Sequence, residues 1–414
     1  MSVDFSWHLE EDTASLPEGE PQKEIHPRRG WLRRVLMILV ILVAAAGVLG
    51  YGYYYRQQQR LIAEFQRVLD QEVTFWRSGR YDSPQLRLVV DVERWRDSKS
   101  NYAILGFFGV TLFPDPRSLP LLTVKKVELH EDMAWVWVEW EDDGARYRRV
   151  HFYRRVDGLW KRTPPDKRFA GRKETLEGTT FHWTFYERDA PYVRPLAEWA
   201  EQMSQQVAAD FGLSEPPRLR VRFVYQVEDS VSRNSRAAQE VVYPAPLITR
   251  VRVDGKPDRL LRTMVAWGYV NHVLETVAPS RPPSLASPYP SAYYRFRSGV
   301  LQWETARVAT PVWKETPYFP TINVDRPLSL DDLFRFPPRR PDGDPFAYVI
   351  SLVFFIGDRY GPTKVIAVLQ QLKETPRIER ALANVLGPDF DVQTFEKEWH
   401  AYLRAHADMF NKEQ

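Results

Sequence analysis

Residues 35–55 read VLMILVILVAAAGVLGYGYYY, and this stretch decides how the rest of the chain is organised. None of its 21 side chains carries a charge. A helix of about 20 residues spans a hydrocarbon core of roughly 30 Å. A soluble helix of this length would normally show a polar face, and this one shows none. The tyrosines at its end suit the headgroup level of a bilayer. We therefore predict a transmembrane helix over residues 31–55, with the lipid bilayer as its partner.

Basic residues flank this span unequally. Four arginines precede it and two follow it closely: Arg28, Arg29, Arg33 and Arg34, then Arg56 and Arg60. The positive-inside rule places the N-terminus in the cytoplasm and exports the C-terminal bulk. Residues 1–30 are expected to form a cytoplasmic tail that is acidic at first and ends in a basic membrane flank. The expected localisation is the cell membrane, single-pass, with the C-terminal domains extracytoplasmic.

A cleaved signal peptide is the alternative explanation of the span. The apolar core of a signal peptide is usually shorter, begins nearer the N-terminus and precedes a cleavage site of small residues. Here 34 residues precede the span and bulky tyrosines follow it. We therefore favour an uncleaved signal-anchor.

Composition describes the remainder as globular and excludes several chemistries. Of the 414 residues, 44% are hydrophobic and 14% aromatic, which is too apolar for a disordered chain. Cysteine is absent, which excludes disulfides, thiolate nucleophiles, cysteine-ligated zinc and iron–sulfur clusters. The formal charge is only +3, and no basic block interleaved with aromatics lies outside the membrane flank, so a nucleic-acid partner is not indicated. High arginine and proline usage without cysteine favours a bacterial source.

The first exported region, residues 56–165, is predicted to be a small α+β domain. An amphipathic helix over 56–78 is followed by strand-like runs: TVKKVEL, MAWVWVEW, YRRVHFYRRV and a short piece around Leu159-Trp160. In the second run, Trp135 and Trp137 fall on one face and the intervening valines on the other. The order of elements and the ending DGLWKRTPPD resemble the cone-shaped fold of the nuclear-transport-factor-like superfamily. Such cones can hold a ligand, but most that are added to larger proteins have no known chemistry.

Residues 166–190 are interpreted as a connector, and residues 191–410 as a second, mostly helical domain with a small N-terminal sheet. A helix over 192–211 and an alternating strand, RLRVRFVYQV, open it. Two further strand-like pieces lie within 239–253. Helices are predicted over 258–278, 291–309, 344–360, 362–373, 376–386 and 391–408. The overall fold class is therefore α+β.

The end of this domain resembles the gluzincin-type zinc metallopeptidases of the MA clan, in particular their membrane-anchored bacterial relatives. The resemblance covers about residues 190–408, roughly half of the chain. It rests on the ordered closing motifs Arg359-Tyr360-Gly361, Ala381-Leu382…Leu386-Gly387 and Glu398-Trp399…Tyr402-Leu403. It implies a helix with an HExxH motif, whose two histidines bind zinc and whose glutamate activates the metal-bound water.

At the corresponding positions the motif is degenerate. The stretch LLRTMVAWGYVNHVLE places Gly268 at the first histidine, Tyr269 at the glutamate and His272 at the second histidine. The later helix RFRSGVLQWE places Ser298 where the family has its third ligand. Zinc catalysis usually needs three protein ligands, and a phenol with a pKa of about 10 is a poor base. We therefore predict no metal and no cofactor, and expect His272 to be a polar residue hydrogen-bonded to the backbone.

Two further features of this region bear on function. Glu275 and Glu304 on neighbouring helices are candidates for acid–base chemistry as a pair, although surface salt bridges to Arg297 or Arg307 are the commoner fate of such residues. A cleft that once held a peptide is expected to keep aromatic walls. The candidates are Trp267, Tyr269, Tyr293, Tyr294 and Trp303, each of which is singly more often a core residue.

The favoured hypothesis is a membrane-anchored pseudopeptidase that binds a peptide or protein, or that has a structural role. One alternative is a hydrolase with a relocated active site. Another is a transmembrane regulator that signals through its acidic tail. Whether the chain is an enzyme is left open, with the missing ligands favouring a non-catalytic role.

Overall fold

The computed structural model describes residues 29–77, 86–97, 120–225, 239–279, 292–309, 322–334, 345–375 and 377–407. Residues 1–27, the acidic part of the predicted tail, lie outside them. The chain divides into two compact units, residues 1–57 and 58–414. Its secondary structure is a mixture of α and β, as predicted.

Helix α1 (Arg29–Arg77) is a single helix of 49 residues, so the predicted membrane span and the amphipathic helix after it are continuous. At 1.5 Å per residue it is roughly 70 Å long. Among the described residues it is the one helix long and apolar enough to cross a bilayer. The apolar side chains of the first unit stand exposed, with Leu36 65% accessible. In water this exposure would be unfavourable, whereas lipid tails remove the cost.

The first sheet, which we call sheet A, confirms the predicted strand-like runs. Its strands are β1 (Thr123–His130), β2 (Met133–Asp142), β3 (Ala145–Val156) and β4 (Leu159–Arg162), paired antiparallel in chain order. A fifth strand, β9 (Val251–Arg252), comes from much later in the chain and pairs with β3.

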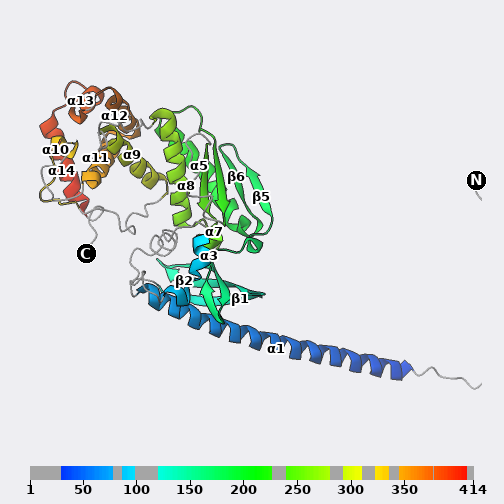
Figure 1. Cartoon of the computed structure of the whole chain (residues 1–414). Helices are drawn as coiled ribbons and strands as arrows, with labels where there is room; N and C mark the ends of the chain where they lie inside the picture. Colours follow the sequence, from blue (N-terminus) through cyan, green and yellow to red (C-terminus); the bar gives the residue numbers. More distant parts are fainter. Residues whose placement is uncertain are drawn as a thin grey trace, which may run out of the picture. The chain divides into compact units, whose positions relative to one another are not determined.

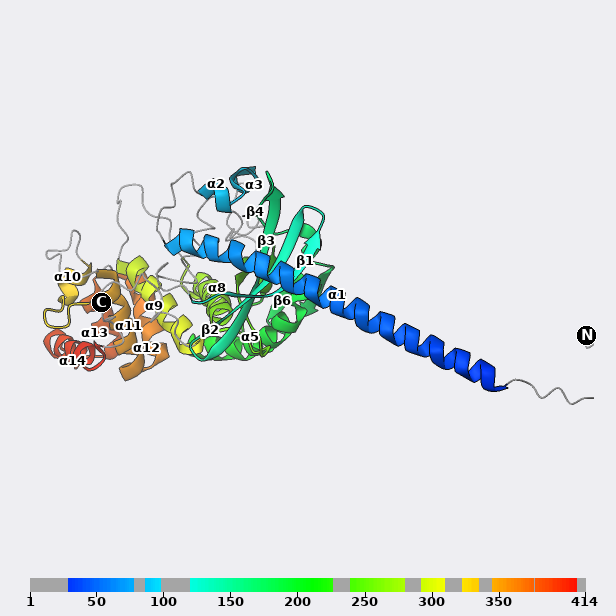
Figure 2. The ribbon, with the colours of Figure 1, turned by 90° about the horizontal axis from the view of Figure 1, so that it is seen from below.

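The two faces of sheet A pack into different cores. Val136 and Val138 face the second half of α1, where Phe65 and Leu69 are buried against them. Figure 2 shows this second half of α1 crossing sheet A. Trp135, on the opposite face, joins the large core of the C-terminal region. The predicted alternation of tryptophans and valines in β2 is therefore confirmed, and the sheet contributes to both cores.

The segment 166–190, interpreted from sequence as a connector, contains two strands of a second sheet, sheet B. Its order is β5 (Lys173–Glu177), β6 (Phe181–Tyr186), β7 (Leu219–Val224) and β8 (Glu240–Pro244). Strands β6, β7 and β8 are parallel, and β5 is antiparallel to β6. Helix α5 (Ala190–Asp210) makes the crossover between β6 and β7.

The remaining helices agree with the predicted ones to within a few residues. They are α8 (Arg259–Val277), α9 (Ala292–Ala309), α11 (Pro345–Tyr360), α12 (Pro362–Glu374), α13 (Ile378–Leu386) and α14 (Val392–Ala405). Short helical turns complete the described fold: α2 (Leu86–Val89), α3 (Val92–Asp97), η2 (Lys167–Phe169), η3 (Glu187–Asp189), α7 (Pro246–Thr249) and α10 (Leu330–Phe334). Figure 1 shows α5 and α8 beside sheet B, with the later helices beyond them.

The helix ends follow from local chemistry. Asp391 caps α14 by accepting a 2.8 Å hydrogen bond from the backbone N–H of Thr394. Pro362 occupies the first turn of α12, where its missing N–H costs nothing. Gly387 ends α13 with a φ of 108°, which a side chain would disfavour.

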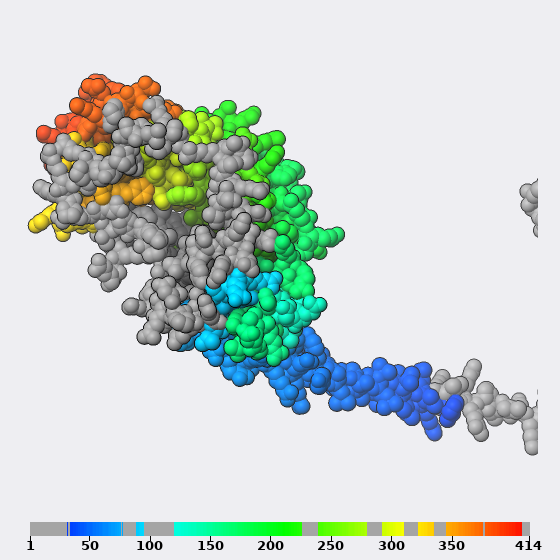
Figure 3. Space-filling view, in the orientation of Figure 1, coloured from blue at the N-terminus to red at the C-terminus, as the bar shows by residue number. Residues whose placement is uncertain are grey.

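The closing helices pack through the sequence motifs noted above. Trp399 is buried, and its indole N–H donates to the Ser351 hydroxyl over 3.2 Å. The Arg359 guanidinium lies 2.9 Å from the Glu398 carboxylate. In Figure 3 the orange to red atoms of these helices gather at the upper left of the view.

Candidate functional site

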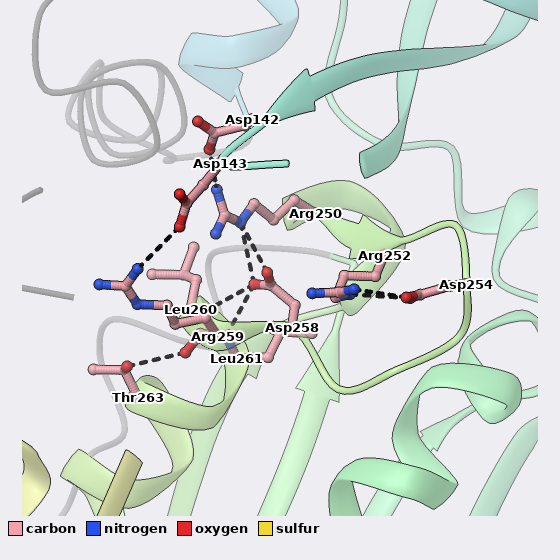
Figure 4. Close-up of polar contacts among 10 residues, drawn as sticks. All are labelled: Asp142, Asp143, Arg250, Arg252, Asp254, Asp258, Arg259, Leu260, Leu261 and Thr263. Atoms are coloured by element: carbon pink, nitrogen blue, oxygen red, sulfur yellow. Dashed lines mark hydrogen bonds and ion pairs between the residues drawn. The ribbon is translucent and has the colours of Figure 1, made fainter. Parts of the chain in front are cut away.

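Helix α8 carries residues 268–272, which the resemblance compares with HExxH, and a buried ion pair fixes where the helix begins. The Asp258 carboxylate accepts hydrogen bonds from the backbone N–H groups of Leu260 (2.9 Å) and Leu261 (3.3 Å). Both of its oxygens also lie 3.1 Å from Nε of Arg250. Nη1 of Arg250 reaches Asp142 at the end of β2, 3.2 Å away (Figure 4). These contacts join the end of sheet A to the first turn of α8.

Gly268 stands at the position that the resemblance assigns to the first histidine. A Cβ atom built there would collide with the hydroxyl oxygen of Tyr243 and lie 3.3 Å from Cγ1 of Val241. Both neighbours belong to β8. The Tyr243 hydroxyl is held in place because it donates a 2.6 Å hydrogen bond to the Met264 carbonyl, one turn earlier in α8. A phenol from the sheet therefore occupies the space that a side chain at position 268 would enter.

Tyr269, at the position of the glutamate, is a core residue. Its side chain is completely buried, and its ring centroid lies 5.1 Å from that of Phe181. Burial raises the pKa of its phenol, and the neighbouring Ser204 hydroxyl offsets this only in part. The phenol therefore stays protonated at neutral pH and is unsuited to accept a proton from water.

His272 is half-buried on α8, four residues after Gly268. Burial lowers the pKa of its imidazole, and a hydrogen bond with the backbone of Arg218 opposes the shift. The ring is therefore neutral at pH 7. His272 is thus a neutral polar residue that is hydrogen-bonded to the backbone, as the sequence predicted.

Ser298 is half-buried on α9, next to an arginine that ties α9 to α8. Nη2 of Arg297 lies 2.8 Å from the Glu275 carboxylate and 3.2 Å from Oδ1 of Asn271. Its Nε donates to the carbonyl of Ala278 over 3.1 Å. The contact between the two helices at this level is thus a salt bridge and hydrogen bonds, with a serine hydroxyl beside it.

Glu275 and Glu304 each bond an arginine of α9, as the sequence analysis considered. Glu304 bonds Arg307, with Nε 3.0 Å from Oε2. The contact is not at the surface, however, because the side chain of Glu304 has no accessible area. Burial raises the pKa of Glu304 to about 8. Arg307 also pairs with Asp210 at the end of α5, so this cluster fastens α9 to α5.

Of the predicted cleft aromatics, Trp303 and Tyr293 are core residues by their contacts, as Tyr269 is. Trp303 is 2% exposed, and it lies so close to Gly357 of α11 that a Cβ on that glycine would be 2.6 Å from the indole ring. Tyr293 is buried, and its hydroxyl donates to the carbonyl of Pro279 over 2.8 Å. These side chains hold α9 against its neighbours.

Trp267 and Tyr294 differ from the other aromatics because part of their surface is accessible. Trp267 is 39% exposed on α8, one residue before Gly268. Tyr294 is half-buried on α9, with its ring centroid 5.7 Å from that of Tyr293. These two are the aromatics of the set that a ligand in solution can reach.

The residues at the degenerate motif do not fit a zinc ion. Position 268 has no donor atom, Tyr269 is buried as a neutral phenol, and Ser298 has a hydroxyl where the resemblance implies a carboxylate. The space beside position 268 holds the Tyr243 hydroxyl. Within the described part of the chain, no three histidine, aspartate or glutamate side chains are grouped in a way that could hold a metal ion. No catalytic step through a metal follows from this arrangement.

A second polar cluster, which the sequence analysis did not identify, lies between α1 and sheet A. The Tyr153 hydroxyl donates to Oε2 of Glu72 over 2.6 Å, and Nδ1 of His151 lies 3.3 Å from the same hydroxyl. Arg162 reaches the other oxygen of Glu72 at 3.5 Å. His151 is 1% exposed, and burial together with Arg162 and Arg149 lowers its pKa. In the sequence, the alternation of polar residues 149, 151 and 153 along β3 could have indicated this cluster.

Comparison with known proteins adds no family to this description. No model of a known protein family matches the chain, and no curated protein shows significant similarity to it.

Proposed function

We propose that this chain is a single-pass membrane protein with a cytoplasmic N-terminus and an extracytoplasmic C-terminal region. We also propose that residues 191–410 form a gluzincin-like scaffold used for binding or structural support, without peptide hydrolysis. The apolar part of α1 supports the anchor by its length and composition. The excess of arginine before the span supports the orientation.

The observation that carries the non-catalytic proposal is the contact between Gly268 and Tyr243. An imidazole at position 268 would need the space that the Tyr243 hydroxyl fills. The hydroxyl is bonded to the α8 backbone, so this packing belongs to the way in which β8 and α8 meet. In the proposed scaffold, the packing of β8 on α8 thus favours glycine at this position.

The proposed ligand of this region is a peptide or another protein. Trp267 supports this, because an accessible indole on the helix that carries the motif offers a large apolar contact at low entropic cost. Tyr294 supplies a second such contact on α9.

The proposed topology can be tested cleanly because the chain has no cysteine. Single substitutions Ser15→Cys in the tail and Lys397→Cys on the exposed face of α14 would be treated with a membrane-impermeant maleimide in intact cells. We expect labelling of the second variant only, and labelling of both after lysis. Labelling of Ser15→Cys in intact cells would contradict the orientation.

The absence of hydrolysis is tested with full-length protein in nanodiscs and a library of quenched fluorescent peptides. We expect no cleavage above that of empty nanodiscs. Cleavage that a chelator abolishes and that disappears in His272→Ala would contradict the proposal and favour the hydrolase alternative.

A further inference from the structure

A pocket of about 290 Å³ lies at the carboxyl ends of β6 and β7. Its lining residues are Lys167, Ala170, Lys173, Thr184, Tyr186, Arg222, Phe223, Val224 and Tyr225. Three of them are cationic and none is acidic. The volume lies just below the range of about 300–1,000 Å³ that is typical of ligand sites, which suits a small ligand. The carboxyl ends of parallel strands are also where open α/β sheets commonly bind ligands.

The register of sheet B explains why polar side chains gather here. Lys173 lies opposite Tyr186, and Thr184 lies opposite Arg222. Residues opposite each other in a sheet share a face. The alternate residues of β6, Phe181, Trp183 and Phe185, are buried in the large core on the other face. The polar lining residues of β5, β6 and β7 therefore lie on the opposite face of sheet B, and the pocket adjoins the large core through Ala170, Phe223 and Tyr225.

The charges around the pocket leave it positive. Arg222 bonds Glu240, with Nε 3.3 Å from Oε1. Within the described residues, Lys167 and Lys173 make no ion pair, and both are exposed. Asp189, beside Tyr225, is completely buried, and burial raises its pKa to about 7. Two ammonium groups are thus left without a carboxylate partner at the pocket.

The rest of the lining offers two aromatic rings at a steep angle to each other, together with hydroxyl groups. The rings of Tyr186 and Tyr225 meet edge to face, with centroids 5.5 Å apart. Thr184 adds another hydroxyl. Charge-assisted hydrogen bonds from lysine to carboxylate or phosphate oxygens are roughly twice as strong as neutral ones. An anionic group on a small, partly flat molecule matches this combination.

We propose that this pocket binds a small molecule bearing a carboxylate or phosphate group, with Lys167 and Lys173 contacting the anion and the two tyrosines contacting the remainder. The proposal is independent of the non-catalytic reading of α8, because the two regions share none of the residues on which they depend.

The test measures binding to the full chain in phosphatidylcholine nanodiscs by titration calorimetry. The probes are inorganic phosphate and succinate, at constant ionic strength set with sodium chloride. We expect saturable binding of at least one probe, weakened about tenfold in Lys173→Gln, as the loss of one charge-assisted hydrogen bond predicts. Lys167→Gln should have a similar effect. The probe that binds more tightly identifies the anion as phosphate or carboxylate.

The matched control is Lys397→Gln, which removes an exposed lysine from α14. It should bind the probes as the parent does. No saturable binding of either probe would overturn the proposal, as would equal weakening in the control and the pocket variants. Because Lys167 and Lys173 are exposed, all three variants should keep the parent's unfolding midpoint, which shows that a loss of binding is not a loss of fold.

Discussion

At the scale of single residues, the contact with Tyr243 explains why glycine fits at position 268, where the resemblance implies a histidine. We expect Gly268→Ala to lower the free energy of unfolding by about 1–3 kcal/mol, because its Cβ would displace the Tyr243 hydroxyl from the Met264 carbonyl. Urea unfolding followed by tryptophan fluorescence measures this cost.

The matched background for that substitution is Tyr243→Phe, which removes the colliding oxygen. Gly268→Ala should lower the unfolding free energy less in the Tyr243→Phe protein than in the parent. We expect a coupling energy of at least about 0.5 kcal/mol between the two substitutions. Equal costs in the two backgrounds would mean that the hydroxyl does not set the size limit at position 268.

Asp189 makes the stability of the folded chain depend on pH. Its carboxyl accepts a 3.1 Å hydrogen bond from the Leu247 N–H in a fully buried site, and burial raises its pKa from 3.8 to about 7. The folded state therefore keeps a proton that the unfolded state releases. The stabilisation is complete below about pH 4 and is lost as the pH rises to about 7, at roughly 1.4 kcal/mol per pH unit at most.

The check is the difference in unfolding free energy between Asp189→Asn and the parent across this range. Asparagine keeps an oxygen for the Leu247 N–H and cannot ionise. The unfolding free energy of the variant relative to that of the parent should rise steadily from pH 4 to pH 7. Above pH 7 the difference should stay constant. A difference independent of pH would show that Asp189 ionises normally.

At the scale of elements, the beginning of α8 depends on Asp258. Asp258→Ala removes the helix cap and leaves the Arg250 guanidinium buried without its main partner. We expect a loss of about 3–5 kcal/mol in unfolding free energy. The control is Asp254→Ala, which breaks the exposed pair with Arg252 in the same loop and should cost at most about 1 kcal/mol. Similar costs for both would contradict the role of the buried pair.

Helices and antiparallel strands were predictable from sequence because their signals are local. Asp391 marked a helix start by capping, and the alternation of Trp135 with Val136 marked a strand. Strand β6 was missed although Phe181 and Trp183 alternate inward, because its polar partner strand β5 made the segment read as a connector. Its parallel partners lie far along the chain, so pairing left no local signal.

The candidate site was predictable in part for the same reason. The identities of Gly268, Tyr269 and His272 could be read from the motif spacing. What fills the space beside Gly268 could not, because Tyr243 comes from a strand whose approach to α8 is set by tertiary packing. The pocket at Lys173 likewise depends on the register of β5 against β6.

At the scale of the whole molecule, the larger core of residues 58–414 reaches from Trp135 of sheet A to Leu403 of α14, and sheet A also packs into the smaller core beneath α1. Strand β9 further joins the late chain to β3. We therefore expect a single cooperative unfolding transition for this unit, with coincident fluorescence and circular dichroism curves. Two separated transitions would instead indicate that residues 56–165 and 191–410 fold independently.

We propose that the chain holds no zinc, because the Tyr243 hydroxyl of β8 fills the space beside position 268. The most direct measurement is the zinc content of full-length protein in nanodiscs, equilibrated with excess zinc and then dialysed against a weak chelator. We expect far less than one zinc per chain, unchanged in His272→Ala. One zinc per chain in the parent, lost in that variant, would contradict the account.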